Sequence, residues 1–200
     1  MKSLTRAWAP LALGAALLAA TLPAAAIDTL NFSEVVGPSL TVTTPAINSG
    51  EAGVSGEEFI VVKEIRNNSN ASWHDYHIQI ESLIDGVWQP SPESDGVSFD
   101  QAGKTPQEWA DSTEVRVNNV TKTGYTASRE APPYDVADFQ FLDFKVNPGD
   151  TLTLTFYMSD NADNTWRLAQ RATIPEPGTL GLLGLAVAGL GALRRRKLAA

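Results

Sequence analysis

The sequence contains two histidines, His74 and His77, in the segment WHDYHIQI. An H-x-x-H pair can bind zinc when both rings point to the same side, as they do on a helix. The segment alternates between apolar and polar residues, which predicts a strand, and residues three apart on a strand face opposite sides of the sheet. We therefore expect one surface histidine and one loop histidine rather than a zinc site.

The segment SDNADNTW, from Ser159 to Trp166, gathers side-chain oxygens in a short space. Calcium prefers six to eight oxygen ligands, and Asp160 and Asp163 could supply some of them. The segment lacks the residue order and the distal glutamate of an EF-hand loop. Aspartate and asparagine also form Asx turns at the ends of strands, and this is the simpler interpretation. We therefore expect no cofactor, and calcium is the one candidate that remains open.

Trp73, Trp88 and Trp166 each lie beside predicted turn or loop residues. Exposed indole rings on one face of a β-domain would form a platform on which sugar rings could stack. Tryptophan also closes the end of a core, with its indole N–H bonded to a nearby oxygen. We favour the second interpretation and keep a carbohydrate-binding module as the alternative. Trp109, in a segment that is either a loop or a short helix, is a further candidate for closing the core.

Catalytic motifs are scarce. The sequence has no cysteine and no G-x-S-x-G or phosphate-binding glycine motif. A glycoside hydrolase uses two carboxylates that face each other across a cleft. The sequence has 23 acidic residues, but no pattern identifies two of them as such a pair. We therefore expect no catalytic residue and no enzymatic activity, with a surface hydrolase as the third alternative.

Short alternating segments dominate the region 27–173. Tyr76, Ile78 and Ile80 fall on one side of a predicted strand, and the segment DTLTLTFYMSD alternates in the same way from Asp150. Asp85-Gly86, Asp95-Gly96 and Pro148-Gly149 are turn signals. No helical apolar stripe occurs, and the segment 139–146 predicts a central strand. The pattern predicts an all-β fold, an antiparallel β-sandwich with Ig-like or jelly-roll-like Greek-key connections and seven or eight strands.

The first 26 residues have the pattern of a signal peptide. Lys2 and Arg6 precede an apolar run, and Ala24 and Ala26 occupy the two small positions that signal peptidase recognises. We therefore expect the chain to be exported, with Ile27 as its first mature residue. The absence of cysteine means that the exported domain is held together without disulfides.

The exported region is strongly acidic. Between Asp28 and Glu176 lie 23 acidic and 9 basic residues, so this region carries a net charge of −14. Such a surface repels phosphate backbones and anionic lipids. We exclude nucleic acid as a partner.

The segment 178–193 is uninterruptedly apolar, and Arg194, Arg195, Arg196 and Lys197 follow it. Its sixteen residues would span about 24 Å as a helix, somewhat less than a hydrocarbon core of roughly 30 Å. The basic cluster 194–197 would remain cytoplasmic. The pattern predicts a short C-terminal transmembrane helix with the domain on the far side of the inner membrane.

The order Pro175-Glu176-Pro177, apolar helix, arginine cluster resembles the PEP-CTERM sorting signal of Gram-negative bacteria, over residues 174–200. The resemblance implies processing by exosortase, transient anchoring in the inner membrane, and delivery to the cell surface or extracellular matrix. Such proteins often occur in species that produce exopolysaccharide and form biofilms. We therefore expect a structural surface or matrix protein associated with exopolysaccharide. A carbohydrate- or calcium-binding module is the alternative.

Overall fold

The computed structural model describes residues 27–54, 56–99, 103–130, 132 and 134–174. The predicted signal peptide and almost all of the predicted sorting segment therefore lie outside the described residues. The expected signal cleavage residues, Ala24 and Ala26, are outside the described residues. So are the sorting motif Pro175, Glu176 and Pro177, the apolar segment 178–193, and the basic residues Arg194, Arg195 and Arg196.

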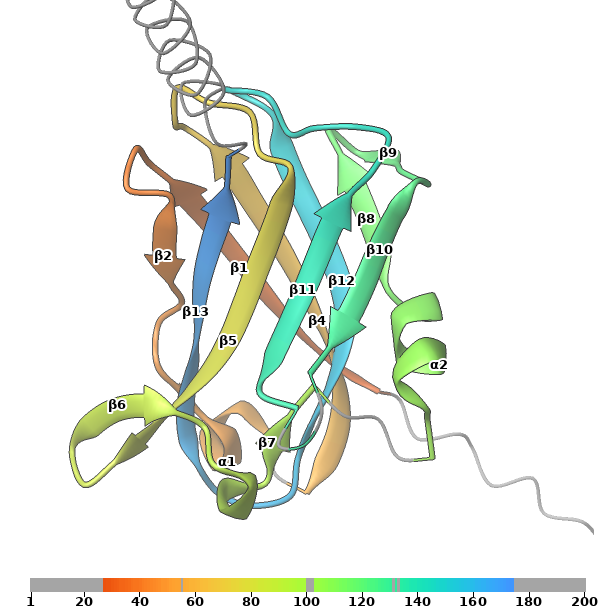
Figure 1. Cartoon of the computed structure of the whole chain (residues 1–200). Helices are drawn as coiled ribbons and strands as arrows, with labels where there is room; N and C mark the ends of the chain where they lie inside the picture. The colour runs from red at the N-terminus through yellow and green to blue at the C-terminus, as the bar shows by residue number, and fades with distance from the viewer. Residues whose placement is uncertain (1–26, 55, 100–102, 131, 133, 175–200) are drawn as a thin grey trace, which may run out of the picture.

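The described residues form two β-sheets that pack face to face (Figure 1). Sheet A has the order β1 (Asp28–Val36), β4 (Glu57–Asn67), β12 (Thr151–Asp160), β8 (Glu114–Val117) and β9 (Val120–Thr121), and β7 (Val97–Ser98) also pairs with β12. Sheet B has the order β10 (Tyr125–Arg129), β11 (Val136–Phe141), β5 (Asp75–Ile84), β13 (Thr165–Thr173) and β2 (Thr41–Thr43), while β3 (Ile47–Asn48) pairs with β13 and β6 (Val87–Pro90) with β5. The all-β prediction and the two-layer arrangement agree with this structure.

Alternating side chains build the core between the sheets. The inward residues of β5 and β12 are fully buried and are those that the sequence pattern assigned to one face: Tyr76, Ile78, Ile80, Leu152, Leu154, Phe156 and Met158. Aromatic contacts join the two layers, with Phe139 of sheet B and Phe156 of sheet A 6.0 Å apart between ring centroids. The alternation therefore positions both the apolar core and the polar outer faces.

The turn chemistry follows the sequence. Asp85 and Gly86 join β5 to β6 with φ values of 52° and 78°, and Ile84 pairs with Val87 directly beside them. Two consecutive residues with positive φ are typical of the type I′ turn that suits a two-residue hairpin. The Asp-Gly pair therefore sets the register of this hairpin.

One predicted feature of the sheets is wrong, because β1 runs parallel to β4 over its whole length, from Asp28 opposite Phe59 to Val36 opposite Asn67. The sandwich is therefore not purely antiparallel. The chain leaves β1 for sheet B, forms β2 and β3, and returns to sheet A as β4, which gives the long crossover that parallel strands require. The inward-facing Glu34 interrupts the apolar alternation of β1 and explains why the pattern did not predict this strand.

The segment 139–146 is also shorter as a strand than predicted, and β11 is not at the centre of sheet B. β11 ends at Phe141, after which the N–H groups of Leu142 and Asp143 both donate to the carbonyl of Gly124, at 2.8 and 3.1 Å. Val146 then forms an isolated bridge to Trp73. Beyond the strand, Val146 is fully buried and Phe144 packs partly buried against the core, whereas Leu142 is exposed.

Two short α-helices occur in the described residues, α1 (Ser49–Ala52) and α2 (Pro106–Asp111), with a 3₁₀ helix at Glu93–Asp95. Thr105 and Glu108 form a reciprocal capping box at the start of α2. This helix carries the fully buried Trp109, whose Nε1 donates to the carbonyl of Tyr157 at 2.9 Å. The expectation that Trp109 closes the core is confirmed.

Candidate functional surface

The outer face of sheet B carries a row of polar side chains that crosses five strands. The registers of β2, β13, β5, β11 and β10 place these residues side by side: Thr41, Arg171, His77, Asp138 and Ser128. The row borders a shallow hollow of about 670 Å³, which Gln79 and Val136 also line. The outer face of sheet B therefore carries hydrogen-bonding groups, whereas its inner face packs against the core.

His77 is the centre of this row. Its Nδ1 contacts Asp138 Oδ1, and its Nε2 lies 3.1 Å from Thr173 Oγ1 and 3.2 Å from Asp75 Oδ1. A neutral ring with the proton on Nδ1 donates to Asp138 and can accept from the Thr173 hydroxyl. The imidazole is thus tied to three strands of sheet B, β5, β11 and β13.

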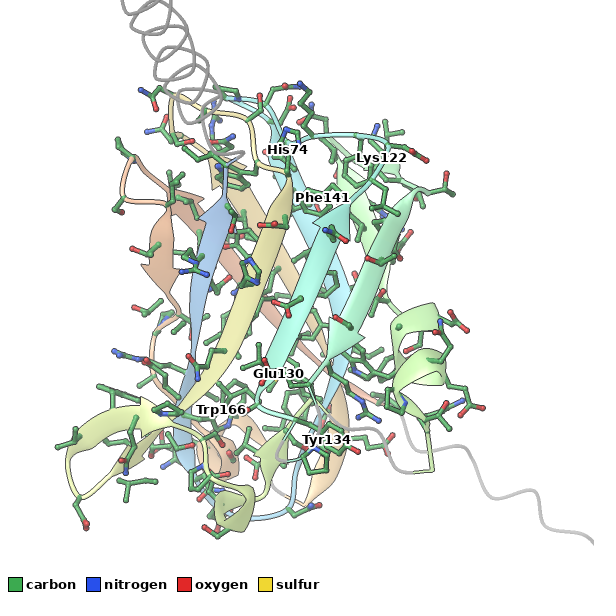
Figure 2. All side chains as sticks on the ribbon, viewed as in Figure 1. His74, Lys122, Glu130, Tyr134, Phe141 and Trp166 are labelled. Atoms are coloured by element: carbon green, nitrogen blue, oxygen red, sulfur yellow. The ribbon has the colours of Figure 1, made fainter. Side chains whose placement is uncertain are left out.

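The two histidines have different positions relative to β5, because His77 lies within the strand and His74 directly precedes it. His74 lies at the start of β5, near Phe141 and at the opposite end of the sheet from Trp166 (Figure 2). The absence of a shared zinc site at the H-x-x-H pair stays a prediction. Within the described residues, no group of three or more His, Asp or Glu side chains is arranged to hold a metal ion.

The prediction that three tryptophans form an exposed sugar platform is wrong for two of them, because Trp73 and Trp166 are fully buried. Trp73 Nε1 donates to Ser69 Oγ at 3.2 Å, and Trp166 Nε1 donates to Ser49 Oγ at 2.9 Å. Their apolar rings fill the core while the N–H groups reach hydroxyls at its ends. The core-closing interpretation holds for both.

Trp88 is the exception, since it lies half-buried on β6. The guanidinium of Arg167 stands 4.3 Å from the centroid of its ring, and Arg167 also pairs with Glu81 at 2.6 Å. One side chain from each of three strands therefore forms a small surface cluster. Trp88 stays a candidate for ligand contact, without the coplanar partners that a platform requires.

The candidate calcium ligands occupy different environments. Asp160 is fully buried, whereas Asp163 is exposed. The Asp160 carboxylate contacts the Ser49 hydroxyl and accepts from the Ala162 N–H at 3.0 Å and from Asn164 Nδ2 at 3.5 Å. These bonds are those of a loop-ordering aspartate, as in the Asx-turn interpretation. A calcium ion at Asp160 and Asp163 stays a prediction.

The buried position of Asp160 makes stability depend on pH. Burial raises the pKa of its carboxyl above the ordinary value of 3.8, although the bonds from Ser49 and Ala162 oppose this. The native state then binds the proton more tightly than the unfolded chain, so the Asp160 contribution to stability is fully present below pH 3.8 and is lost as the pH rises through the native pKa.

Asp160→Asn removes this titration. We expect the difference in unfolding free energy, variant minus wild type, to be more positive at neutral pH than near pH 4, as measured by urea denaturation. Asp163→Asn, which makes the same substitution at an exposed position of the same loop, is the matched control. A difference that is independent of pH, or that reverses sign, would show that the Asp160 carboxyl is not perturbed in the native state.

The class of protein that these features define is an acidic two-layer β-domain without an evident catalytic constellation in its described part. Residues 173–197 match a family model described as the PEP-CTERM protein-sorting motif. The match confirms the resemblance and marks the chain as an exported protein that exosortase sorts to the cell surface. No curated protein and no solved structure shows significant similarity, so the Ig-like or jelly-roll-like assignment stays a prediction.

The sorting motif begins where the folded domain ends. The match starts at Thr173, the last residue of β13. No helix within the described residues is long and apolar enough to span a membrane, and the predicted helix 178–193 lies outside them. The position of Thr173 beside His77 could not be inferred from the sequence. Only the outward alternation of His77, Gln79 and Glu81 pointed to this polar face.

Proposed function

We propose that this chain is a structural protein of the cell surface or extracellular matrix that contacts exopolysaccharide through the outer face of sheet B. The observation that carries this proposal is the direct continuation of β13 into the sorting motif at Thr173. The β-domain is thus the cargo that the motif delivers, and no residue of it is assigned a catalytic role. Exosortase and signal peptidase are its partners during processing.

The chemistry of the outer face supports contact with a polysaccharide. Sugar hydroxyls both donate and accept hydrogen bonds, and the row offers donors in Arg171 and Ser128 and acceptors in Asp138. The row crosses five strands about 4.8 Å apart, so an extended chain of several sugar units could lie along it. The apolar surface of Val136 within the hollow can contact the ring carbons.

A binding measurement tests this assignment. The purified exported protein is sedimented with exopolysaccharide from the producing cells, and the bound fraction is measured against polymer concentration. We expect Arg171→Ala and Gln79→Ala to weaken binding several-fold, because each removes hydrogen bonds worth about 1 kcal/mol. Arg66→Ala, an exposed arginine on the opposite sheet, is the matched control. Absence of binding by the wild type, or equal losses in the control, would contradict the proposal.

A further inference from the structure

Four polar side chains meet in the core between the sheets. Lys63 and Tyr76 are fully buried, Gln170 is 4% exposed, and the side chain of Glu34 is 6% exposed. They come from four strands, β4 and β1 of sheet A and β5 and β13 of sheet B. Gln170 also lines the outer-face hollow, but within the described residues no side-chain hydrogen bond joins this cluster to the polar row or to the sorting motif.

Glu34 connects the cluster. Lys63 Nζ lies 3.0 Å from Glu34 Oε1 and 2.9 Å from Oε2, and Gln170 Nε2 donates to the same Oε2 at 2.9 Å. The lysine nitrogen and the glutamine carboxamide are therefore separated by no more than two hydrogen-bond lengths. On the other side of the carboxamide, Tyr76 donates its hydroxyl proton to Gln170 Oε1 at 3.1 Å.

Burial shifts the pKa values of Lys63 and Tyr76 in the directions that an acyl transfer would use. Burial lowers the pKa of Lys63 to about 8, against the opposing effect of Glu34, so a substantial fraction of the amine is neutral near that pH. Burial, followed by the charge of Glu34, raises the pKa of Tyr76 well above its ordinary value, so its hydroxyl keeps the proton that it donates. A desolvated lysine amine is a competent nucleophile, and a hydrogen bond to a carbonyl oxygen favours attack on its carbon.

A simple stabilising role accounts poorly for this cluster. Removing an ammonium and a carboxylate from water costs several kcal/mol for each ion, and replacing a buried ion pair by apolar residues is often neutral or stabilising. The side chain of Lys63 also lies against the ring of Phe32, 4.7 Å from the centroid, in a site that an apolar side chain could fill. Lys63 and Gln170 instead converge on one carboxylate oxygen of Glu34, and Tyr76 donates to the carboxamide of Gln170 from the other side.

We propose that Lys63 and Gln170 form an intramolecular isopeptide bond between the two sheets. The neutral Lys63 amine attacks Cδ of Gln170 while Tyr76 stabilises the developing charge on Oε1. Glu34 takes the proton from the attacking nitrogen and delivers it to Nε2 of Gln170. The bond between Cδ and Nε2 breaks, the bond between Cδ and Nζ remains, and one molecule of ammonia leaves. Amine and carboxamide thus become a secondary amide and ammonia, without an oxidant.

The bond would give this chain a covalent cross-link that its composition otherwise lacks. Exported domains commonly use disulfides, and this sequence has no cysteine. The link would join the second strand of sheet A, β4, to β13 in sheet B.

Peptide mapping tests the bond directly. The folded full-length protein is purified after export, denatured and digested with trypsin, which does not cut after an acylated lysine. We expect the peptide Leu168–Arg171 to be joined to the peptide that contains Lys63, uncut after that residue, with a mass one ammonia below the sum of the two. Lys63→Met should abolish the linked species, and Glu34→Gln should reduce it by a large factor, because it removes the proton carrier.

Lys145→Met, which removes an exposed lysine, is the matched control and should leave the linked peptide at the wild-type yield. A free Leu168–Arg171 peptide together with cleavage after Lys63 in the wild type would overturn the proposal. A product lighter by water instead of ammonia would also overturn it, since it would place the bond between Lys63 and Glu34. If a core variant does not fold, the wild-type spectrum alone decides.

Discussion

Trp166→Ala is expected to lower the free energy of unfolding by about 3–5 kcal/mol. Trp166 is fully buried, stacks on Phe59 of the opposite sheet with 5.9 Å between ring centroids, and donates its N–H to Ser49. Truncation leaves a cavity between the sheets and removes a hydrogen bond that also orders the Ser49–Asp160 pair. Chemical denaturation monitored by circular dichroism measures the change.

Trp88→Ala is the matched control for this variant, because it deletes the same side chain from a half-buried position on β6. We expect its effect to be under half that of Trp166→Ala, since the lost contact is chiefly the cation–π interaction with Arg167. Similar losses in both variants would contradict the division between core-closing and surface tryptophans.

Replacing Pro175, Glu176 and Pro177 together by alanine is expected to abolish the surface-exposed form. The wild type recovered from the surface should lack everything after about Pro177, whereas the variant should remain in the inner membrane with its C-terminus intact. Proline disfavours helix in the residue before it, so the motif favours an extended form that a processing enzyme can bind, whereas alanines permit helix. Cell fractionation and intact-mass measurement give both readings.

Glu130→Ala, which removes an exposed acidic residue of the folded domain, is the control for this variant and should be processed normally. Recovery of wild-type protein from the cell surface with Arg194, Arg195 and Arg196 still attached would contradict cleavage by exosortase and support a plain membrane anchor.

Local patterns predicted those parts of the fold that depend on neighbouring residues. The strict alternation of β12 and β5 identified their buried faces, because one side of each strand meets the core. The Asp85-Gly86 pair located a hairpin, because few residues adopt two positive φ values in succession. The capping residues of α2 were present in the sequence, although the competing loop interpretation could be decided only by the packing of Trp109.

Features that depend on distant residues could not be predicted in the same way. β1 was missed because Glu34 occupies an inward position, and its acceptability there depends on Lys63 of the neighbouring strand. The predicted tryptophan platform was wrong because a tryptophan beside a turn can point inward or outward. The hydroxyls of Ser69 and Ser49, which accept the indole N–H groups, are brought near by the tertiary fold. The convergence of Lys63 and Gln170 on Glu34 likewise depends on the packing of two sheets.

The position of β13 decides how the domain would respond to tension. β13 lies inside sheet B, between β5 and β2, and its last residue leads into the sorting motif. Consider a pull on Ile174 that is directed along the axis of this strand. Its hydrogen bonds to β5, which extend from Trp166 to Thr173, would then be loaded together in shear instead of breaking one after another. The strand that leads into the sorting motif would therefore also be the strand whose hydrogen bonds resist the pull.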